Sequence, residues 1–247
     1  MKISIITCTW NSIKFIDQSI NSVLNQNFKN IEYIFVDGGS TDGTLERIEA
    51  IPIEVKVLNG VTGGIAKAMN AGIQAATGDI IAHLHSDDYY LADDVLSRVI
   101  AHFEKSDKAW LFGRVRFDDD GHLNPETYIA PRYSYRNILK RNFIPHPATF
   151  IKREVFDSRG TFSESLRYAM DYEFWLRIGR RYEPIQIDEP LAAFRRHAGS
   201  TTQANFMRSF NEDFRVRLSY GNWLQTPEIF LRYLVRRYRH HTAGQDK

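Results

Sequence analysis

The 247-residue chain has only one cysteine, Cys8, and almost no excess of charge of either sign. One cysteine can form neither an internal disulfide nor a thiolate zinc site, which favours a reducing, cytosolic compartment. The chain has 32 basic and 30 acidic residues, which leave a net charge of +2. This near-balance excludes a broad nucleic-acid-binding surface as the default interpretation. No apolar run approaches the roughly eighteen residues of a membrane span. The amino terminus also lacks the apolar stretch and cleavage site of a signal peptide.

Short apolar runs alternate with helical patterns along the chain. β-Branched runs predict strands, and apolar residues that recur every three to four positions predict helices. We expect strands at 3–8, 31–36, 53–58, 79–84 and 110–117, helices at 15–24, 42–50, 64–76, 93–103 and 171–181, two short strands on either side of 188–190, and closing helices at 203–220 and 227–240. This order indicates the α/β class, with a mostly parallel central sheet flanked by helices. The loops after the strands are where such sheets bind ligands.

A glycine-rich turn, residues 37–44, follows the second expected strand. Glycines let the backbone approach a ligand closely, and Asp42 suits a helix cap. The turn is not a dinucleotide fingerprint, since no Gly-x-Gly-x-x-Gly follows the first or second strand. It is not a Walker loop either, since no Gly-Lys-Ser/Thr follows. By itself it indicates only a tight turn.

Two adjacent carboxylates, Asp87 and Asp88, follow the fourth expected strand. Their mutual repulsion is costly unless a cation or hydrogen bonds compensate it. A Mg²⁺ ion bridging to phosphate oxygens would do so with one or two protein carboxylates. The alternative is that Asp88 caps a turn while Asp87 faces water.

Two later clusters carry further polar groups. Asp171 stands in the first turn of an expected helix, where an acid ordinarily compensates the helix dipole. Residues 195–201 combine two arginines and His197 with the hydroxyls of Ser200 and Thr201, a set that suits a diphosphate. For His197 an ordinary surface histidine is the alternative.

In their order these clusters resemble the family 2 glycosyltransferases, which share the GT-A fold. Residues 9–11 resemble the family's opening motif, and residues 37–44 resemble its Asp-Asp-Gly-Ser-x-Asp-x-Thr signature, with Gly38 in place of the second aspartate. Residues 85–87 occupy the Asp-x-Asp slot, with His85 in place of the first aspartate. Residues 170–171 fall on the Glu-Asp motif, with Met170 in place of the glutamate. The match covers residues 3–202, some four-fifths of the chain.

The resemblance implies a role for each candidate residue. Asp171 would be the catalytic base. The residues that would bind the nucleotide are Thr9, Trp10, Asn11, Asp37, Lys67, Ser86 and Arg196. Among these, Asp37 would contact the nucleobase. The residues that would hold Mg²⁺ or Mn²⁺ are Asp87, Asp88 and His197. Residues 1–202 would form the GT-A domain, and 203–247 a C-terminal helical extension packed on the same domain.

The implied function is inverting transfer of a sugar from a nucleotide-diphosphate sugar, with UDP favoured, to a hydroxyl of a glycan or lipid-linked acceptor in surface polysaccharide biosynthesis. The expected location is the cytoplasm, with no nucleic-acid partner. A basic amphipathic segment at 227–241 leaves open a peripheral contact with the inner face of the membrane.

Two other functions stay open. Residues 83–88 resemble the His-x-His-x-Asp-His motif of metallo-β-lactamase-like hydrolases, with aspartate in place of the last histidine. The substitutions at His85 and Met170 also allow a non-catalytic protein that binds nucleotide sugars. Metal content tests the first alternative, and transfer or hydrolysis of a sugar nucleotide tests the second.

Overall fold

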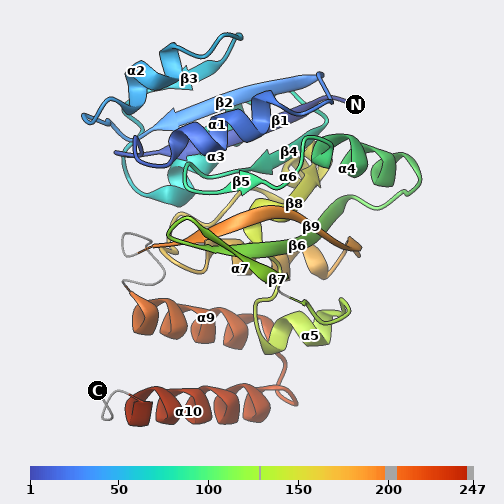
Figure 1. Cartoon of the computed structure of the whole chain (residues 1–247). Helices are drawn as coiled ribbons and strands as arrows, with labels where there is room; N and C mark the ends of the chain where they lie inside the picture. The colour runs from blue at the N-terminus through green and yellow to red at the C-terminus, as the bar shows by residue number, and fades with distance from the viewer. Residues whose placement is uncertain (128, 198–204, 244–247) are drawn as a thin grey trace.

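The structure, a computed structural model, describes residues 1–127, 129–197 and 205–243 (Figure 1). The strands are β1 (Ile3–Thr9), β2 (Ile31–Asp37), β3 (Lys56–Leu58), β4 (Ile80–His83), β5 (Tyr89–Tyr90), β6 (Trp110–Asp119), β7 (His122–Thr127), β8 (Thr149–Lys152) and β9 (Ile185–Arg196). The helices are α1 (Ile16–Leu24), α2 (Thr44–Glu49), α3 (Ile65–Ala75), α4 (Val95–Glu104), α5 (Tyr135–Lys140), α6 (Arg153–Arg159), α7 (Met170–Gly179), α9 (Phe206–Tyr220) and α10 (Thr226–Ala243), with a 3₁₀ turn η1 (His146–Ala148). These elements confirm the α/β class.

The amino-terminal half of the sheet is parallel. β1 pairs in parallel with β2 on one side and with β4 on the other, and β2 pairs in parallel with β3. β1 is buried along its whole length, as its β-branched sequence predicts for a central strand covered on both faces. Because these strands run the same way, the loops that follow them meet at one edge of the sheet.

The second half of the sheet has mixed pairing. The order in the described part of the chain is β3-β2-β1-β4-β8-β6-β9-β5, with β7 paired to β6. β8 runs antiparallel to β4 and β6, whereas β9 runs parallel to β6. β9 therefore brings residues 195–197 back to the edge where β1, β2 and β4 end.

The expected pair of short strands around 188–190 is wrong, because β9 is one continuous strand. Its pairing with β6 shifts register around Arg114, which lies opposite Pro190. This irregularity accommodates a proline, which has no N–H for the ladder. Gly113 lies at the same place, and a Cβ there would come within 2.6 Å of the Leu191 side chain. The close approach of the two backbones explains why the strand continues through the proline.

Helices cover both faces of the sheet, and α9 and α10 lie at the opposite end of the molecule from β3 and α2 (Figure 1). Val216 of α9 and Ile229 of α10 are buried in the same apolar cluster as Trp110, Phe174 and Trp175. The closing helices thus pack on the core that the sheet and α7 share. The division at residue 202 stays a prediction. Among the described helices, none has the length and apolar character needed to cross a bilayer.

Candidate active site at the carboxyl edge of the sheet

Asp37 ends β2 next to Thr9 of β1, and its carboxylate organises the turn that follows. Oδ1 accepts hydrogen bonds from the backbone N–H groups of Gly39 and Ser40 at 2.8 and 2.7 Å. Oδ2 accepts from the hydroxyls of Thr9 and Ser40 at 2.7 and 2.6 Å. Burial alone would raise the pKa of Asp37, but these hydrogen bonds, those from Ser40 first, hold it below its usual value.

The base contact assigned to Asp37 stays a prediction, because these hydrogen bonds all come from within the chain. A carboxylate accepts about four hydrogen bonds, and all four acceptor positions of Asp37 are filled from within the chain. The residue has no exposed surface. A base could reach it only by displacing one of the donors. The Thr9 hydroxyl is engaged in one of these bonds, so that both residues hold the turn, and the nucleotide contact assigned to Thr9 also stays a prediction.

The residues that follow β1 frame this turn. Asn11 adopts a left-handed φ of 50°, and its Oδ1 accepts a hydrogen bond from the Thr41 N–H at 2.9 Å. Trp10 is 71% exposed and lies against Gly38, where a Cβ would come 3.4 Å from the indole Cδ1. The indole is therefore an open aromatic surface at the carboxyl edge, suited to stack on a base.

Ser86 and Lys67 approach the same edge from β4 and α3. The Ser86 hydroxyl donates to the Ser12 hydroxyl at 2.8 Å and ties the loop after β4 to the loop after β1. Lys67 is exposed in the first turn of α3 and folds back over Gly63. Its ammonium group remains available to an anion, as the nucleotide assignment requires.

The carboxylate turn after β4 separates Asp87 from Asp88. Asp87 Oδ2 lies 3.1 Å from Nε2 of His197, and both side chains are partly exposed. Asp88 points into the protein, where its Oδ1 accepts from the backbone N–H of Arg195 at 3.0 Å. Burial, and then the charge of Asp87, raise the pKa of Asp88 well above its usual range. The carboxyl group of Asp88 is thus turned inward to β9, and its assignment as a metal ligand stays a prediction.

The side chains of Arg195 and Arg196 in β9 point to opposite faces of the sheet, because successive side chains of a strand do so. Arg196 forms a bidentate pair with Asp119, with both N–O distances 2.6 Å, and its guanidinium lies over Phe117. Arg196 is thus engaged by Asp119, and its assignment to the diphosphate stays a prediction. Arg195, to which the sequence analysis gave no role of its own, is the buried one.

Arg195 supports the carboxylate turn from below. Its Nε donates to the backbone carbonyl of Asp87 at 3.0 Å, and its Nη2 lies 3.3 Å from Asp118 Oδ2. The guanidinium also contacts Gln18 and lies 4.6 Å over the Phe15 ring. Arg195 thus fixes the backbone that presents Asp87. The hydroxyls of Ser200 and Thr201 lie outside the described residues.

A divalent ion fits the Asp87–His197 pair as a partial site. The pair offers one carboxylate and one imidazole, donors that manganese and related ions accept. The described residues hold no group of three or more histidine, cysteine or acidic side chains arranged around one metal position. Phosphate oxygens would have to complete the coordination, as is usual for Mg²⁺ at phosphate sites.

Asp171 lies in the first turn of α7 and is 21% exposed. Burial raises its pKa from the usual 3.8 to about 7, against the hydrogen bond that Oδ1 accepts from the Tyr172 N–H, and the charge of Asp213 raises it further. Oδ2 lies 4.0 Å from Nδ1 of His146. A carboxyl group with this pKa can take up a proton at neutral pH.

Three imidazoles lie between Asp171 and the carboxylate turn. The ring of His146 lies 5.3 Å from that of His85 and 5.4 Å from that of His83. Burial, and the neighbouring imidazoles, keep the pKa of His83 and of His146 below the usual value, so both are neutral. The His146 ring therefore lies next to both Asp171 and His85, and His85 stands two residues before Asp87 in the sequence. Sequence reasoning placed His85 and His146 only within motifs.

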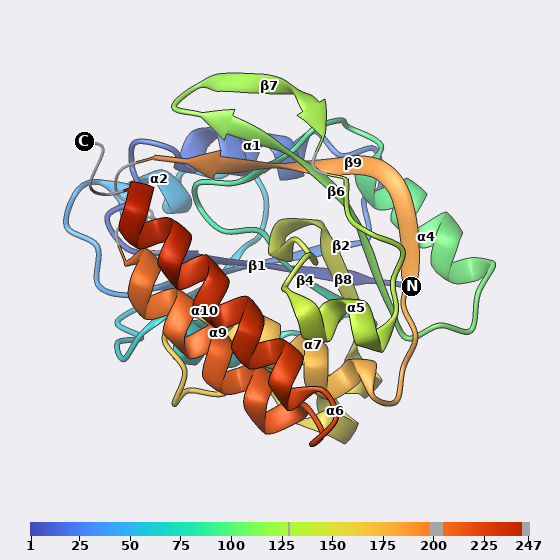
Figure 2. The same cartoon turned by 90° about the horizontal axis from the view of Figure 1, so that it is seen from below.

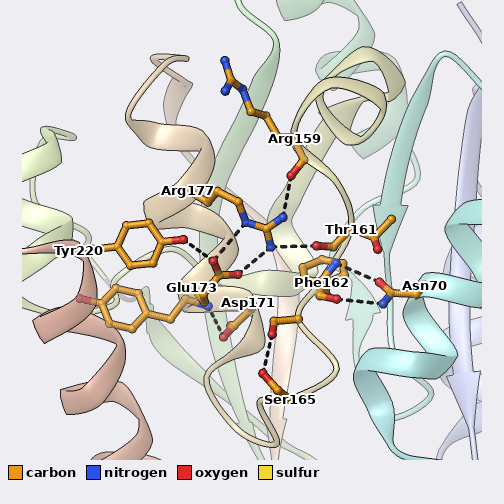
Figure 3. A network of polar contacts seen from close by, with 11 residues as sticks. Asn70, Arg159, Thr161, Phe162, Ser165, Asp171, Glu173, Arg177 and Tyr220 are labelled. Carbon is orange, nitrogen blue, oxygen red and sulfur yellow. Dashed lines mark hydrogen bonds and ion pairs between the residues drawn. The ribbon is translucent and has the colours of Figure 1, made fainter.

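Side chains from distant segments brace the start of α7. Glu212 of α9 accepts hydrogen bonds from the backbone N–H groups of residues 167, 168 and 169, at 2.5–3.1 Å. Figure 3 shows a second brace, in which Arg177 pairs with Glu173 at 2.7 Å and donates to the carbonyls of Arg159 and Thr161, while Tyr220 contacts Glu173. Glu173 and Arg177 are four residues apart on one helix, but the sequence carries no local signal for the contacts with Arg159, Thr161, Glu212 and Tyr220, because these partners are far apart in the chain.

An α/β sheet with a carboxylate turn and a separate basic carboxylate at its carboxyl edge has the GT-A fold of nucleotide-sugar-dependent transferases. Residues 4–160 match the sequence profile described as glycosyl transferase family 2, and the chain belongs to that family. The family assignment made from the sequence motifs is confirmed.

Curated relatives and solved structures agree with this assignment. An uncharacterized glycosyltransferase of Haemophilus influenzae is 27% identical over 81% of this chain and 67% of its own length. Chondroitin synthase of Pasteurella multocida is 30% identical over 71% of this chain, which spans only 18% of that protein. The structure of S. aureus TarS residues 1–349 in complex with UDP-GlcNAc has a TM-score of 0.77 at 21% identity, covering 97% of this chain and 73% of that one. A mannosyltransferase of Pyrobaculum calidifontis, in complex with GDP-Man and Mn²⁺, has a TM-score of 0.70 at 18% identity, covering 90% and 65%.

Proposed function

We propose that the protein is an inverting glycosyltransferase that uses a nucleotide-diphosphate sugar, with UDP as the favoured nucleotide. The observation that carries this proposal is Asp171, a single carboxyl group with a pKa of about 7 that is still partly exposed. A general base works best when its pKa is near the working pH, and contributes roughly 10²–10⁴-fold. One base and one displacement from the opposite face would invert the anomeric centre.

The donor would lie across the ends of β1, β2 and β4. Trp10 would stack on the base, and the backbone around Gly38 would approach it in place of the Asp37 carboxylate. Asn11 would hold the turn at Thr41, while Lys67 and Ser86 would meet the phosphates. Arg195 would keep Asp87 in position from below. Solved relatives in complex with UDP-GlcNAc and with GDP-Man support a donor of this class.

Asp87 and His197 would hold a Mg²⁺ or Mn²⁺ ion against the diphosphate, with Mn²⁺ present in the mannosyltransferase complex. The bound ion would supply charge stabilisation to the departing nucleoside diphosphate. His197 rests on Phe15, with ring centroids 4.7 Å apart, which orients its Nε2 toward Asp87. On the acceptor side, Asp171 would receive the hydroxyl proton on Oδ2, next to the neutral His146.

The acceptor is proposed to be a hydroxyl of a glycan or of a lipid-linked glycan in surface polysaccharide biosynthesis. Relatives named hyaluronan synthase and chondroitin synthase support a polysaccharide role, although this chain spans only 18% of each. A lipid-linked acceptor would place the protein in the cytoplasm at the inner face of the membrane. No nucleic-acid partner is part of the proposal.

The test is a thermal-shift screen of nucleoside diphosphates and their sugars with and without Mn²⁺, followed by hydrolysis and transfer assays on the sugar nucleotides that bind. Ligands that bind the folded state raise the melting temperature with concentration. We expect UDP-sugars to stabilise the protein and to be turned over by the wild type, and not by Asp171→Asn. Binding without turnover by the wild type would support the non-catalytic alternative and overturn the proposed reaction. A product that keeps the donor's anomeric configuration would overturn the inverting mechanism.

A further inference from the structure

Helix α10 carries an apolar stripe on its outer face. Leu231, Leu234, Val235 and Tyr238 recur at positions i, i+3, i+4 and i+7, a spacing that places them on one side of a helix. They are 63%, 57%, 43% and 70% exposed. We call these four residues the apolar stripe. Large apolar side chains in such a continuous exposed row mark an interaction surface on a soluble domain.

The opposite side of α10 holds the helix on the protein. Ile229 is buried, and the Tyr233 ring stacks on Phe214 and Phe210 of α9 at 4.0 and 5.1 Å between centroids. Tyr233 also donates to Asn211 at 2.9 Å. α10 is the outermost element at this end of the molecule, and the view from below has it in front of α9 (Figure 2). The side of α10 that packs on α9 through Tyr233 is therefore opposite the apolar stripe.

Two more exposed apolar residues, Trp223 and Leu224, stand just before α10, and they are 80% and 66% exposed. Tryptophan and tyrosine favour the interface between lipid headgroups and acyl chains, because one end of each ring is apolar and the other polar. The segment 223–238 thus has aromatic side chains at both ends of an aliphatic centre. This composition is typical of helices that lie in a membrane surface.

The charge around the stripe is positive. Residues 226–243 have four arginines and one acid, Glu228. By helical geometry Arg232 and Arg237 lie on the two flanks of the stripe. Glu228 is already engaged by Arg232 at 3.0 Å and by Lys140 at 3.8 Å. Arg232 and Lys140 both line a groove of about 280 Å³ beside α10, and Arg136 is a third cationic residue that lines it. Arg232 and Arg237 thus flank the stripe, while Lys140 and Arg136 add positive charge beside Glu228 and Ile229.

We infer that α10 docks the protein on an anionic lipid surface through the apolar stripe. A second copy of this chain would bring one arginine-rich helix against another, and the like charges would oppose the contact. An anionic bilayer instead offers acyl chains to the stripe and phosphate groups to Arg232 and Arg237. This inference goes beyond the proposed reaction and does not depend on it, since it concerns a surface on which no residue of the candidate active site lies.

The experiment measures co-sedimentation of the full chain with vesicles of phosphatidylcholine, alone or mixed with phosphatidylglycerol. We expect binding to the mixed vesicles at low salt and little binding to phosphatidylcholine alone, with the former fading as salt screens the arginines. Leu231→Glu/Leu234→Glu should weaken binding about tenfold or more, because it places charge where apolar surface is buried. Arg232→Gln/Arg237→Gln should weaken binding and flatten its salt dependence.

The matched control is Ile53→Glu/Ile129→Glu, which makes the same charge change at two exposed apolar residues that lie outside α10. This variant should bind like the wild type. If Ile53→Glu/Ile129→Glu loses as much vesicle binding as Leu231→Glu/Leu234→Glu, the docking site is wrong. Equal binding of the wild type to neutral and anionic vesicles would also overturn it. A wild-type dimer in sedimentation equilibrium that Leu231→Glu/Leu234→Glu converts to a monomer would assign the stripe to self-association instead. Sugar-nucleotide turnover, measured without vesicles, should be the same in all these proteins. A failure of the lipid-docking proposal can therefore be told apart from a failure of the proposed reaction.

Discussion

The substitution Asp171→Asn tests the base assignment through two quantities that should move in opposite directions. The asparagine Oδ1 can still accept the hydrogen bond from the Tyr172 N–H, so the start of α7 keeps its geometry. The side chain can no longer take a proton from an acceptor hydroxyl. Transfer should therefore fall by about 10²–10⁴-fold. The same change removes a buried charge, which should make the protein more stable.

The gain in stability follows from the pKa of Asp171. A carboxyl group with a pKa of about 7 when folded and 3.8 when unfolded destabilises the fold by up to about 4 kcal/mol once it is fully ionised. This cost is small near pH 4, grows as the pH rises from about 4 to about 7, where the unfolded chain ionises while the folded protein still holds the proton, and is fully present above about pH 7. Asparagine bears no such cost. For a chain of this size each kcal/mol shifts the melting temperature by about 2–4 °C.

Thermal unfolding of the wild type and Asp171→Asn across pH, together with transfer rates, checks both effects. The variant should melt several degrees higher at pH 8, and the difference should close toward pH 4. Wild-type transfer should rise through about pH 7 as Asp171 ionises. A variant with near-normal transfer would remove Asp171 from the mechanism. A melting temperature that is lower at every pH would refute the buried charge and leave Asp171 with a packing role.

Four further substitutions test the rest of the site. Asp37→Ala should lower the free energy of unfolding by several kcal/mol, because each buried donor left unpaired costs about 1–3 kcal/mol. Unchanged stability together with weaker nucleotide binding would instead support a contact between Asp37 and the nucleobase. Asp87→Ala should abolish the effect of Mn²⁺ on nucleoside diphosphate binding in calorimetry, whereas Asp88→Asn should keep this effect. If the two variants lose the Mn²⁺ effect equally, the different orientations of the two side chains do not decide metal binding. Glu212→Ala should lower kcat more than it changes KM for the donor, because it releases the backbone before Asp171; an unchanged kcat would limit Glu212 to stability.

The fold was predictable because its signals are local. The β-branched runs that became β1, β2 and β4, and the helical spacing of α1 and α4, follow from burial on the faces of a sheet. The continuity of β9 was harder to predict, because Pro190, in the middle of the strand, ordinarily interrupts one. Only the pairing partner shows why it does not, since the close approach at Gly113 lies on another strand.

The candidate site was predictable in residue type and less so in orientation. The order of motifs brought Asp37, Asp87 and Asp171 to one edge, but it could not tell which carboxylates are free. Asp37 and Asp88 are consumed by hydrogen bonds from residues 39–40 and 195. Arg196 and Arg195 differ by one position, which on a strand exchanges the two faces. The register of β9 against β6 decides which arginine lies under the turn, and that register is set by residues 111–119.

The position of α9 connects the carboxyl-terminal helices to the chemistry. Glu212 holds the three backbone N–H groups that precede Met170, and Asp213 adds the charge that helps to raise the pKa of Asp171. Two adjacent residues of α9 thus influence both the placement and the basicity of the proposed base. α10 packs on the far side of α9 through Tyr233. α9 therefore has one face toward Asp171 and the other toward α10, so that a change in the packing of α10 can reach the proposed base through Glu212 and Asp213.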